Sequence, residues 1–124
     1  MIGLPRGLSV FAMNEPVDMR KSFDTLAAVV SLLMKREVLT GDLFLFVSKD
    51  RKRAKVLYFD GTGMCLFAKR LDKGQFSAPW KQRRVEMTLS ELALFIEGSD
   101  AMLHPLSPPL LRHADLTQKF STQR

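Results

Sequence analysis

Runs of apolar residues alternate with clusters of charge and glycine along the middle of the chain. Leu43 to Val47, Ala54 to Asp60 and Met64 to Leu71 have the length and composition of strands. A basic connection joins the first two runs, and a DGTG connection joins the last two. Because its glycines allow a tight hairpin turn, we predict three consecutive strands, the first of them central in a sheet. A phosphate-binding glycine loop would need a lysine and a following helix, which this turn lacks.

Helical periodicity occurs on both sides of these three strands. After Asp18, apolar residues recur at spacings of three and four, which predicts a helix from Met19 to Arg36 with Asp18 as its N-cap. Thr88 and Glu91 have the spacing of a capping box, and Gly98 is placed to end the helix that follows. We therefore predict two helices.

Two shorter segments complete the predicted fold. Leu8 to Met13 has the character of a first strand, and Gln75 to Trp80 resembles a short edge strand because it contains a proline. The pattern thus predicts a single α+β domain over residues 1–99, with a mainly antiparallel sheet of about five strands and two packed helices. Beyond residue 99 the composition shifts toward Pro, Gln, Ser and Thr, so we expect residues 100–124 to be a tail, partly ordered at best.

Composition adds a positive charge to this picture. The 124 residues include 19 Lys and Arg against 13 Asp and Glu, for a formal net charge of +6. Such a balance favours polyanionic partners. The single cysteine, Cys65, cannot form an internal disulfide and is expected to be a small buried apolar residue, and no segment has the length of a membrane helix or a signal peptide. We expect a cytoplasmic protein without membrane contact.

The positive charge is concentrated in one part of the chain. Eleven cationic and three acidic residues lie between Lys49 and Arg84. Basic turns near aromatic residues favour contact with the phosphates of DNA, although the same loop could be merely solvated or could face an acidic protein. Arg20 and Lys21 fall in the first turn of the predicted helix, where they could hold an anion or be two solvated charges. The predicted nucleic-acid-binding residues are Arg20, Lys21, Arg51, Lys52, Arg53, Lys55, Lys69, Arg70 and Lys73.

Groups suited to catalysis do not converge in the sequence. His104 and His113 are nine residues apart, a spacing that matches no common zinc motif. Asp18, Asp60 and Glu91 each have a local role as a cap or turn residue, so no cluster of acidic metal ligands is expected. We therefore predict no enzymatic activity, no metal and no cofactor.

Several ordered motifs carry a family resemblance. They are PVDMRKSFDTL (Pro16 to Leu26), GDLFLF (Gly41 to Phe46), KVLYFDG (Lys55 to Gly61), GMCLFAKRL (Gly63 to Leu71), GQF (Gly74 to Phe76) and LSELALFIEG (Leu89 to Gly98). In this order they resemble the TnpB (Orf2-like) accessory proteins of bacterial insertion sequences of family sixty-six. Ser22 stands where that family's PxDMRKGFDGL motif usually has glycine.

The resemblance implies a small protein that acts in transposition beside a separate transposase and a companion accessory protein. It implies no known active site. RNA-guided nucleases that share the short name are far longer and carry acidic motifs absent here, so their activity is not transferred. Two hypotheses follow: a non-catalytic accessory protein that binds DNA through a basic β-hairpin surface, or an adaptor that docks the transposase or the companion protein through Leu103 to Phe120.

Overall fold

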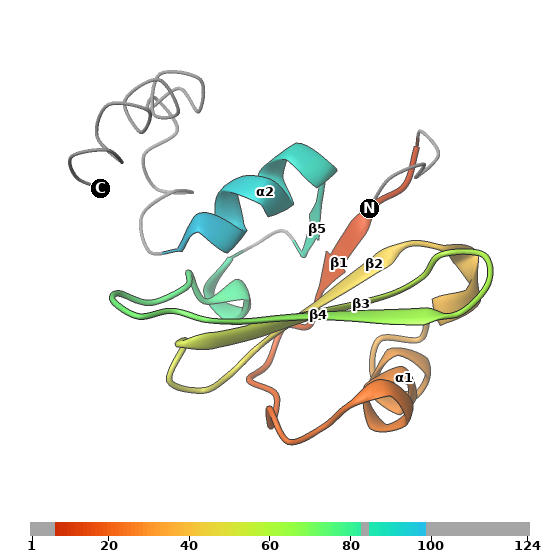
Figure 1. Cartoon of the computed structure of the whole chain (residues 1–124), viewed down its shortest axis with the longest axis horizontal. Coiled ribbons are helices and arrows are strands. Elements are labelled where there is room, and N and C mark those ends of the chain that lie inside the picture. The colour runs from red at the N-terminus through yellow and green to blue at the C-terminus, as the bar shows by residue number, and fades with distance from the viewer. Residues whose placement is uncertain (1–6, 83–84, 99–124) are drawn as a thin grey trace.

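A five-stranded sheet separates two helices, one on each face (Figure 1). The computed structural model describes residues 7–82 and 85–98. The strand order is β4-β3-β2-β1-β5, and every neighbouring pair is antiparallel except β1 and β2. This arrangement confirms the predicted α+β class. The elements are β1 (Val10–Ala12), α1 (Phe23–Leu32), the 3-10 turn η1 (Val38–Thr40), β2 (Leu43–Val47), β3 (Arg53–Phe59), β4 (Met64–Arg70), the 3-10 turn η2 (Pro79–Lys81), β5 (Glu86–Met87) and α2 (Leu89–Glu97).

The meander from β2 to β4 forms as the apolar pattern predicts. All five residues of β2 are buried, because the strand lies in the middle of the sheet and is covered on both faces. Alternate residues of β2 therefore supply two separate cores. Phe44 and Phe46 pack on the side of α1, whereas Leu43, Leu45 and Val47 pack on the side of α2. Burying each of these side chains contributes about 1.5–3 kcal/mol to folding.

Helix α1 is shorter than the sequence predicts and begins at a different cap. A turn around Asp18 precedes it, because Asp18 Oδ1 accepts a hydrogen bond of 2.9 Å from the backbone N–H of Arg20. Ser22 is the N-cap instead, and its backbone N–H donates to Thr25 Oγ1 at 2.8 Å. The helix ends before Lys35, which has a φ of 58°. The predicted span from residue 19 to residue 36 was therefore wrong at both ends.

The segment predicted as an edge strand from residue 75 to residue 80 is a loop that ends in η2. The backbone N–H of Phe76 donates to the carbonyl of Arg51 at 2.7 Å, and the Phe76 side chain is fully buried against Phe95. The fifth strand is β5, which pairs with β1. Large apolar side chains such as Phe76 place this segment against the core. The same apolar residues are also typical of an edge strand, so the sequence pattern did not distinguish the two.

Helix α2 begins with the predicted capping box. The backbone N–H of Glu91 donates to Thr88 Oγ1 at 3.1 Å, and the Thr88 N–H donates to Glu91 Oε1 at 2.8 Å. Gly98 ends the helix with a φ of 99°.

Cys65 is half-buried rather than buried as predicted, and its thiol donates to Asp60 at 3.5 Å.

The predicted tail and both histidines lie outside the described residues. Within residues 7–82 and 85–98, neither helix is long and apolar enough to cross a membrane.

Candidate nucleic-acid interface

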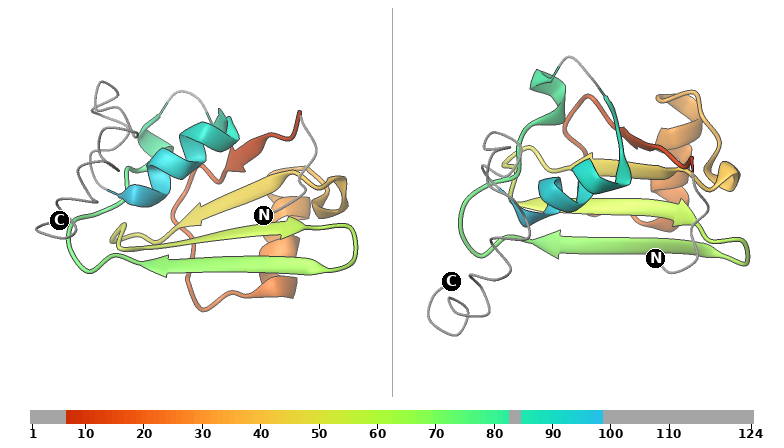
Figure 2. Two further views of the ribbon diagram at one scale, coloured as in Figure 1. Left: turned by 45° about the horizontal axis from the view of Figure 1, so that its top comes forward. Right: turned by 90° about the horizontal axis from the view of Figure 1, so that it is seen from above.

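One end of the sheet gathers most of the predicted binding residues. The β2–β3 turn, the first residues of β3, the last residues of β4 and the loop after β4 meet there (Figure 2). The backbone N–H of Leu71 donates to the carbonyl of Lys52 at 2.8 Å, which continues the β3–β4 ladder into this region. We call it the basic end. Its cationic residues are Lys49, Arg51, Lys52, Arg53, Lys55, Lys69, Arg70 and Lys73.

The β2–β3 turn has a defined shape. Ser48 Oγ donates to Asp50 Oδ1 at 2.6 Å, and the same oxygen accepts from the backbone N–H of Lys52 at 3.0 Å. These two bonds lower the pKa of Asp50, with the Ser48 hydroxyl as the larger cause. Arg51 has a φ of 60° and directs its guanidinium back to the loop, where it donates to Gln75 Oε1 at 3.1 Å. The turn consequently exposes Lys52 while Arg51 braces the loop after β4.

Arg53 and Arg70 lie directly opposite each other on β3 and β4. Residues paired across strands share a face of the sheet. Both side chains therefore project from the face on which α1 packs, beyond the part of that face that α1 covers. Lys55 pairs with Ala68 on the same face. These residues, together with Met19, line an open depression of about 470 Å³. We call it the basic depression.

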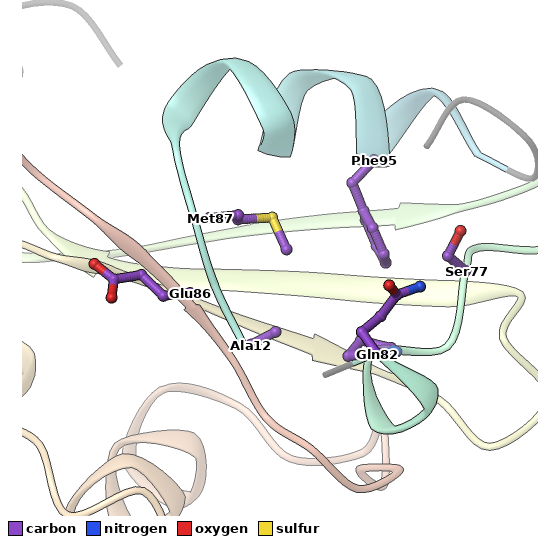
Figure 3. A pocket seen from close by; sticks show the side chains of 7 residues that line it. Ala12, Ser77, Gln82, Glu86, Met87 and Phe95 are labelled. Atoms are coloured by element: carbon purple, nitrogen blue, oxygen red, sulfur yellow. The ribbon is translucent and has the colours of Figure 1, made fainter. Parts of the chain in front are cut away.

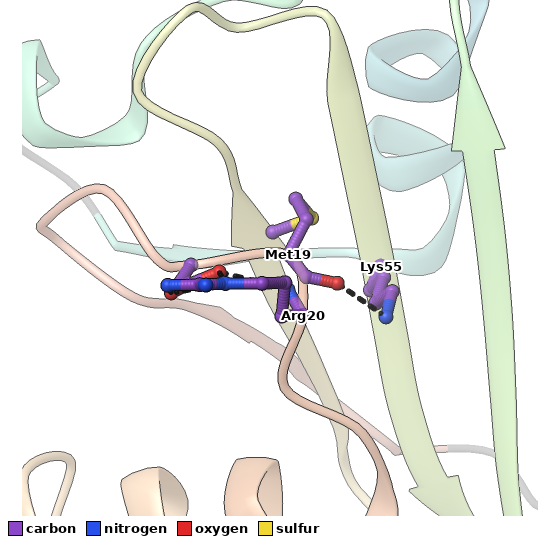
Figure 4. Close-up of polar contacts among 4 residues, drawn as sticks. Met19, Arg20 and Lys55 are labelled. Atoms are coloured by element: carbon purple, nitrogen blue, oxygen red, sulfur yellow. Dashed lines mark hydrogen bonds and ion pairs between the residues drawn. The ribbon is translucent and has the colours of Figure 1, made fainter.

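Lys55 fixes one wall of the basic depression. Its Nζ donates to the carbonyl of Met19 at 2.9 Å (Figure 4). It also donates to the carbonyl of Lys21 at 2.8 Å. The half-buried ammonium group therefore ties the segment before α1 to the middle of the hairpin. Its charge still faces the depression, but its hydrogen bonds serve the chain.

The hydrogen bonds of Lys55, and not a helix N-terminus as predicted, hold the backbone around Arg20 and Lys21 next to the basic depression. The Arg20 side chain extends away from Lys55 (Figure 4). The Arg20 guanidinium donates to Asp18 Oδ2 at 2.7 Å and is otherwise exposed. That hydrogen bond is the main reason that the pKa of Asp18 falls to about 2. The local charge of Arg20 is consequently balanced, whereas Lys21 has no described carboxylate partner within residues 7–82 and 85–98.

Lys69 and Lys73 complete the predicted set, but Lys69 points to the other face of the sheet. Its Nζ donates to the carbonyl of Ile96 at 2.8 Å, in the last turn of α2. A cation at this position is stabilised by the partial negative charge at the C-terminal end of the helix. Lys73 is exposed in the loop after β4, and Lys49, which the predicted set omits, is exposed at the β2–β3 turn. In the sequence, Lys49 could have been recognised as a candidate binding residue only from its position next to the other basic residues.

A second hollow lies on the opposite face, between β5, η2 and α2 (Figure 3). It measures about 50 Å³, and its walls include Ala12, Met87 and Phe95. This volume holds only one or a few waters, and the walls are mainly apolar. Among the described residues, no three His, Cys, Asp or Glu side chains gather closely enough to hold a metal ion.

The fold and this surface define a small α+β protein with a localised cationic face. Residues 8–104 match the family model described as IS66 Orf2-like protein. The chain belongs to this family, whose members are accessory proteins of insertion sequences.

Two relatives from Sinorhizobium fredii (strain NBRC 101917 / NGR234) support this assignment. The uncharacterized protein y4jC is 36% identical over 101 residues, which are 81% of this chain and 86% of the relative. The uncharacterized protein y4hO is 35% identical over 100 residues, or 78% of this chain and 87% of the relative. No solved structure matches the chain significantly.

Proposed function

We propose that this protein is a non-catalytic accessory protein of DNA transposition that binds DNA phosphates through the basic depression. Family membership supplies the process, and the apposition of Arg53 and Arg70 supplies the main support for DNA contact. Like charges directly opposite on neighbouring strands destabilise a sheet. A phosphate placed between the two guanidinium groups would turn this repulsion into two charge-assisted contacts.

The basic residues divide into two roles in this proposal. Arg53, Arg70, Lys52 and Lys73 expose their charge and contact phosphates, with Arg20 and Lys21 extending the surface. The side chains of Arg51, Lys55 and Lys69 donate to groups of the chain itself and hold the surface in shape. Phosphate contacts of this kind carry no sequence information, so we expect binding across many DNA sequences.

Fluorescence anisotropy on labelled duplexes at several salt concentrations tests this proposal. The duplexes are the terminal inverted repeat of the element and a shuffled sequence. Arg53→Gln and Arg70→Gln should each weaken binding to both and reduce the salt slope by about one. A preference for the terminal repeat would add recognition of the ends of the element.

Lys35→Asn is the matched control. It also removes one exposed positive charge, at the end of α1, and asparagine tolerates the left-handed backbone of this position. Affinity and salt slope in Arg53→Gln and Arg70→Gln equal to those of this control would contradict the role of the basic depression.

An adaptor function is the second candidate, and exposed leucines support it. Leu32, Leu33 and Leu39 are exposed at the end of α1 and in η1. Co-purification with the transposase and the companion accessory protein tests this candidate. Loss of either partner in Leu32→Ser/Leu39→Ser would assign docking to this surface. Deletion of residues 101–124 tests the predicted docking segment from Leu103 to Phe120, because a partner that still binds excludes it.

A further inference from the structure

Strand β4 is an edge of the sheet with one row of unused backbone groups. Within residues 7–82 and 85–98, β3 is its single strand neighbour, and the sheet order ends at β4 (Figure 2). The strand has seven residues, which is long for an edge that another strand does not cover.

The hydrogen bonds at the two ends of the hairpin identify the unused groups. The N–H of Asp60 donates to the carbonyl of Gly63, and the N–H of Leu71 donates to the carbonyl of Lys52. Hydrogen-bonded pairs alternate with non-hydrogen-bonded pairs along an antiparallel ladder. Odd-numbered residues of β4 therefore bond to β3, and the even-numbered ones direct their N–H and C=O groups outward. These outward residues are Met64, Leu66, Ala68 and Arg70.

Phe67 stands at the middle of β4 with an exposed aromatic ring. It is 46% exposed although it follows the half-buried Leu66 in the same strand. It pairs with Val56 on the face that carries α2. An exposed aromatic side chain at the centre of an open edge would be covered best by another aromatic group in the same position.

We propose that β4 pairs antiparallel with β4 of a second copy of this chain. The two-fold axis passes between the two Phe67 residues, so Met64 of each copy pairs with Arg70 of the other, and Leu66 with Ala68. In this register each of the four outward residues lies opposite an outward residue of the other copy. The four pairs form about eight backbone hydrogen bonds between the two strands. Phe67 then faces Phe67 in a non-hydrogen-bonded pair, where cross-strand side chains approach most closely.

The charges along β4 favour this antiparallel pairing. Lys69 and Arg70 lie at one end of the strand, and the Asp60 turn lies at the other. The pairing places the cationic end of each copy beside the Asp60 turn of its mate. The carboxylate of Asp60 has a pKa of about 2 and is therefore charged at neutral pH. A parallel pairing would instead bring the two cationic ends together.

The proposed dimer has a consequence for the basic depression. Antiparallel strands related by a two-fold axis present the same face, so both depressions lie on one side of a ten-stranded sheet. The two Arg70 residues are separated by roughly 20 Å along the strand direction, from six steps of strand rise. The dimer itself does not depend on DNA binding and is tested without DNA.

Light scattering during size-exclusion chromatography tests the assembly. We expect a dimer for the wild type and a monomer for Phe67→Lys, which places two ammonium groups face to face at the axis. Phe23→Lys is the matched control, because Phe23 is 43% exposed at the start of α1, and it should remain dimeric. A wild-type monomer at every concentration overturns the proposal and leaves the edge to a strand of another protein.

A disulfide tests the register. Non-hydrogen-bonded pairs have Cα atoms about 4.5 Å apart, within the range that a disulfide spans. In a Cys65→Ser background, Phe67→Cys should therefore cross-link two chains on mild oxidation. Ala68→Cys should not, because residue 68 faces residue 66 of its mate. Cross-linking at residue 68 instead of residue 67, or equally at both, overturns the proposed register.

Discussion

Lys55 donates a hydrogen bond of 2.8 Å from its ammonium group to the backbone carbonyl of Lys21, which is 34 residues earlier in the chain. One predicted binding residue thus positions the backbone of another. The same ammonium also bonds the carbonyl of Met19, so β3 determines where the segment before α1 lies.

Replacement of Lys55 by methionine should destabilise the protein. The change keeps the length of the side chain but removes two hydrogen bonds from a charged donor, so we expect a loss of about 2 kcal/mol in the free energy of unfolding. Urea denaturation measures it. Lys52→Met, at an exposed residue, should change the value by less than about 0.5 kcal/mol. Equal effects of the two substitutions would contradict the structural role of Lys55.

Replacement of Arg70 by glutamine should stabilise the monomer slightly, at protein concentrations too low for two β4 strands to pair. The substitution removes the repulsion with Arg53 across the β3–β4 pair, and we expect a gain of at most about 0.5 kcal/mol at low salt. The gain should shrink as salt rises, because ions screen exposed charges. Thermal unfolding at two salt concentrations measures this difference. A loss of stability at low salt would show that Arg70 has a favourable partner in the free protein.

Gly41 and Gly63 should respond differently to alanine. Gly41 follows η1 with a φ of 92°, a left-handed conformation that costs a residue with a Cβ about 1–2 kcal/mol. Gly63 has no positive φ and no atom within 4 Å of an added Cβ. We therefore expect Gly41→Ala to lower the urea midpoint and Gly63→Ala to leave it unchanged or raise it. The reverse order would contradict the described turns.

Removal of the threonine cap should weaken α2. Thr88→Ala leaves the N–H of Glu91 without its acceptor and should cost about 1 kcal/mol in unfolding free energy. Ser90→Ala is the control in the same helix, where alanine is the better helix former and a small gain is expected. If both variants are equally stable, the capping box contributes nothing measurable.

Stability should fall with acid in a range that Asp60 helps to set. Backbone N–H groups of Thr62 and Gly63 bond its carboxylate at 2.9 and 3.0 Å and lower its pKa from 3.8 to about 2. The unfolded chain therefore binds this proton at higher pH than the folded protein. The contribution of Asp60 is complete above about pH 3.8 and is lost as the pH falls through about 2.

The variant Asp60→Asn measures this contribution. Asparagine retains an oxygen acceptor but does not titrate, so its unfolding free energy should fall less than that of the wild type between about pH 5 and about pH 2. Asp18, whose pKa is also about 2, titrates in the same range and accounts for part of the remaining loss. Parallel pH profiles of variant and wild type would contradict the role of Asp60.

The hairpin and its arginine pair could be derived from the sequence, because both depend on local geometry. Apolar runs of strand length predicted the strands, and the glycines of the DGTG turn predicted the connection between the last two. Once Asp60 and Gly63 close that turn, Arg53 must face Arg70. Register alone thus brings together two arginines that are 17 positions apart.

The sequence did not show which groups the remaining side chains would choose. Asp18 was the predicted helix cap, but its carboxylate accepts hydrogen bonds from Arg20, and Ser22 caps α1 instead. Lys55 and Lys69 donate to backbone carbonyls of distant segments. Every residue has a backbone carbonyl, so the sequence does not indicate which one a lysine will bind. Strand β5 has two residues, too few to show any alternation.

The length of β3 fixes the distance between two surfaces of the protein. Arg53 begins the strand at the basic end, and Phe59 ends it near η1, where Leu39 is exposed. Six steps of strand rise separate the two by roughly 20 Å, and the hydrogen-bonded sheet does not stretch. A DNA phosphate bound at Arg53 and a protein bound at Leu39 would therefore be held at a constant spacing, on two separate surfaces of this chain.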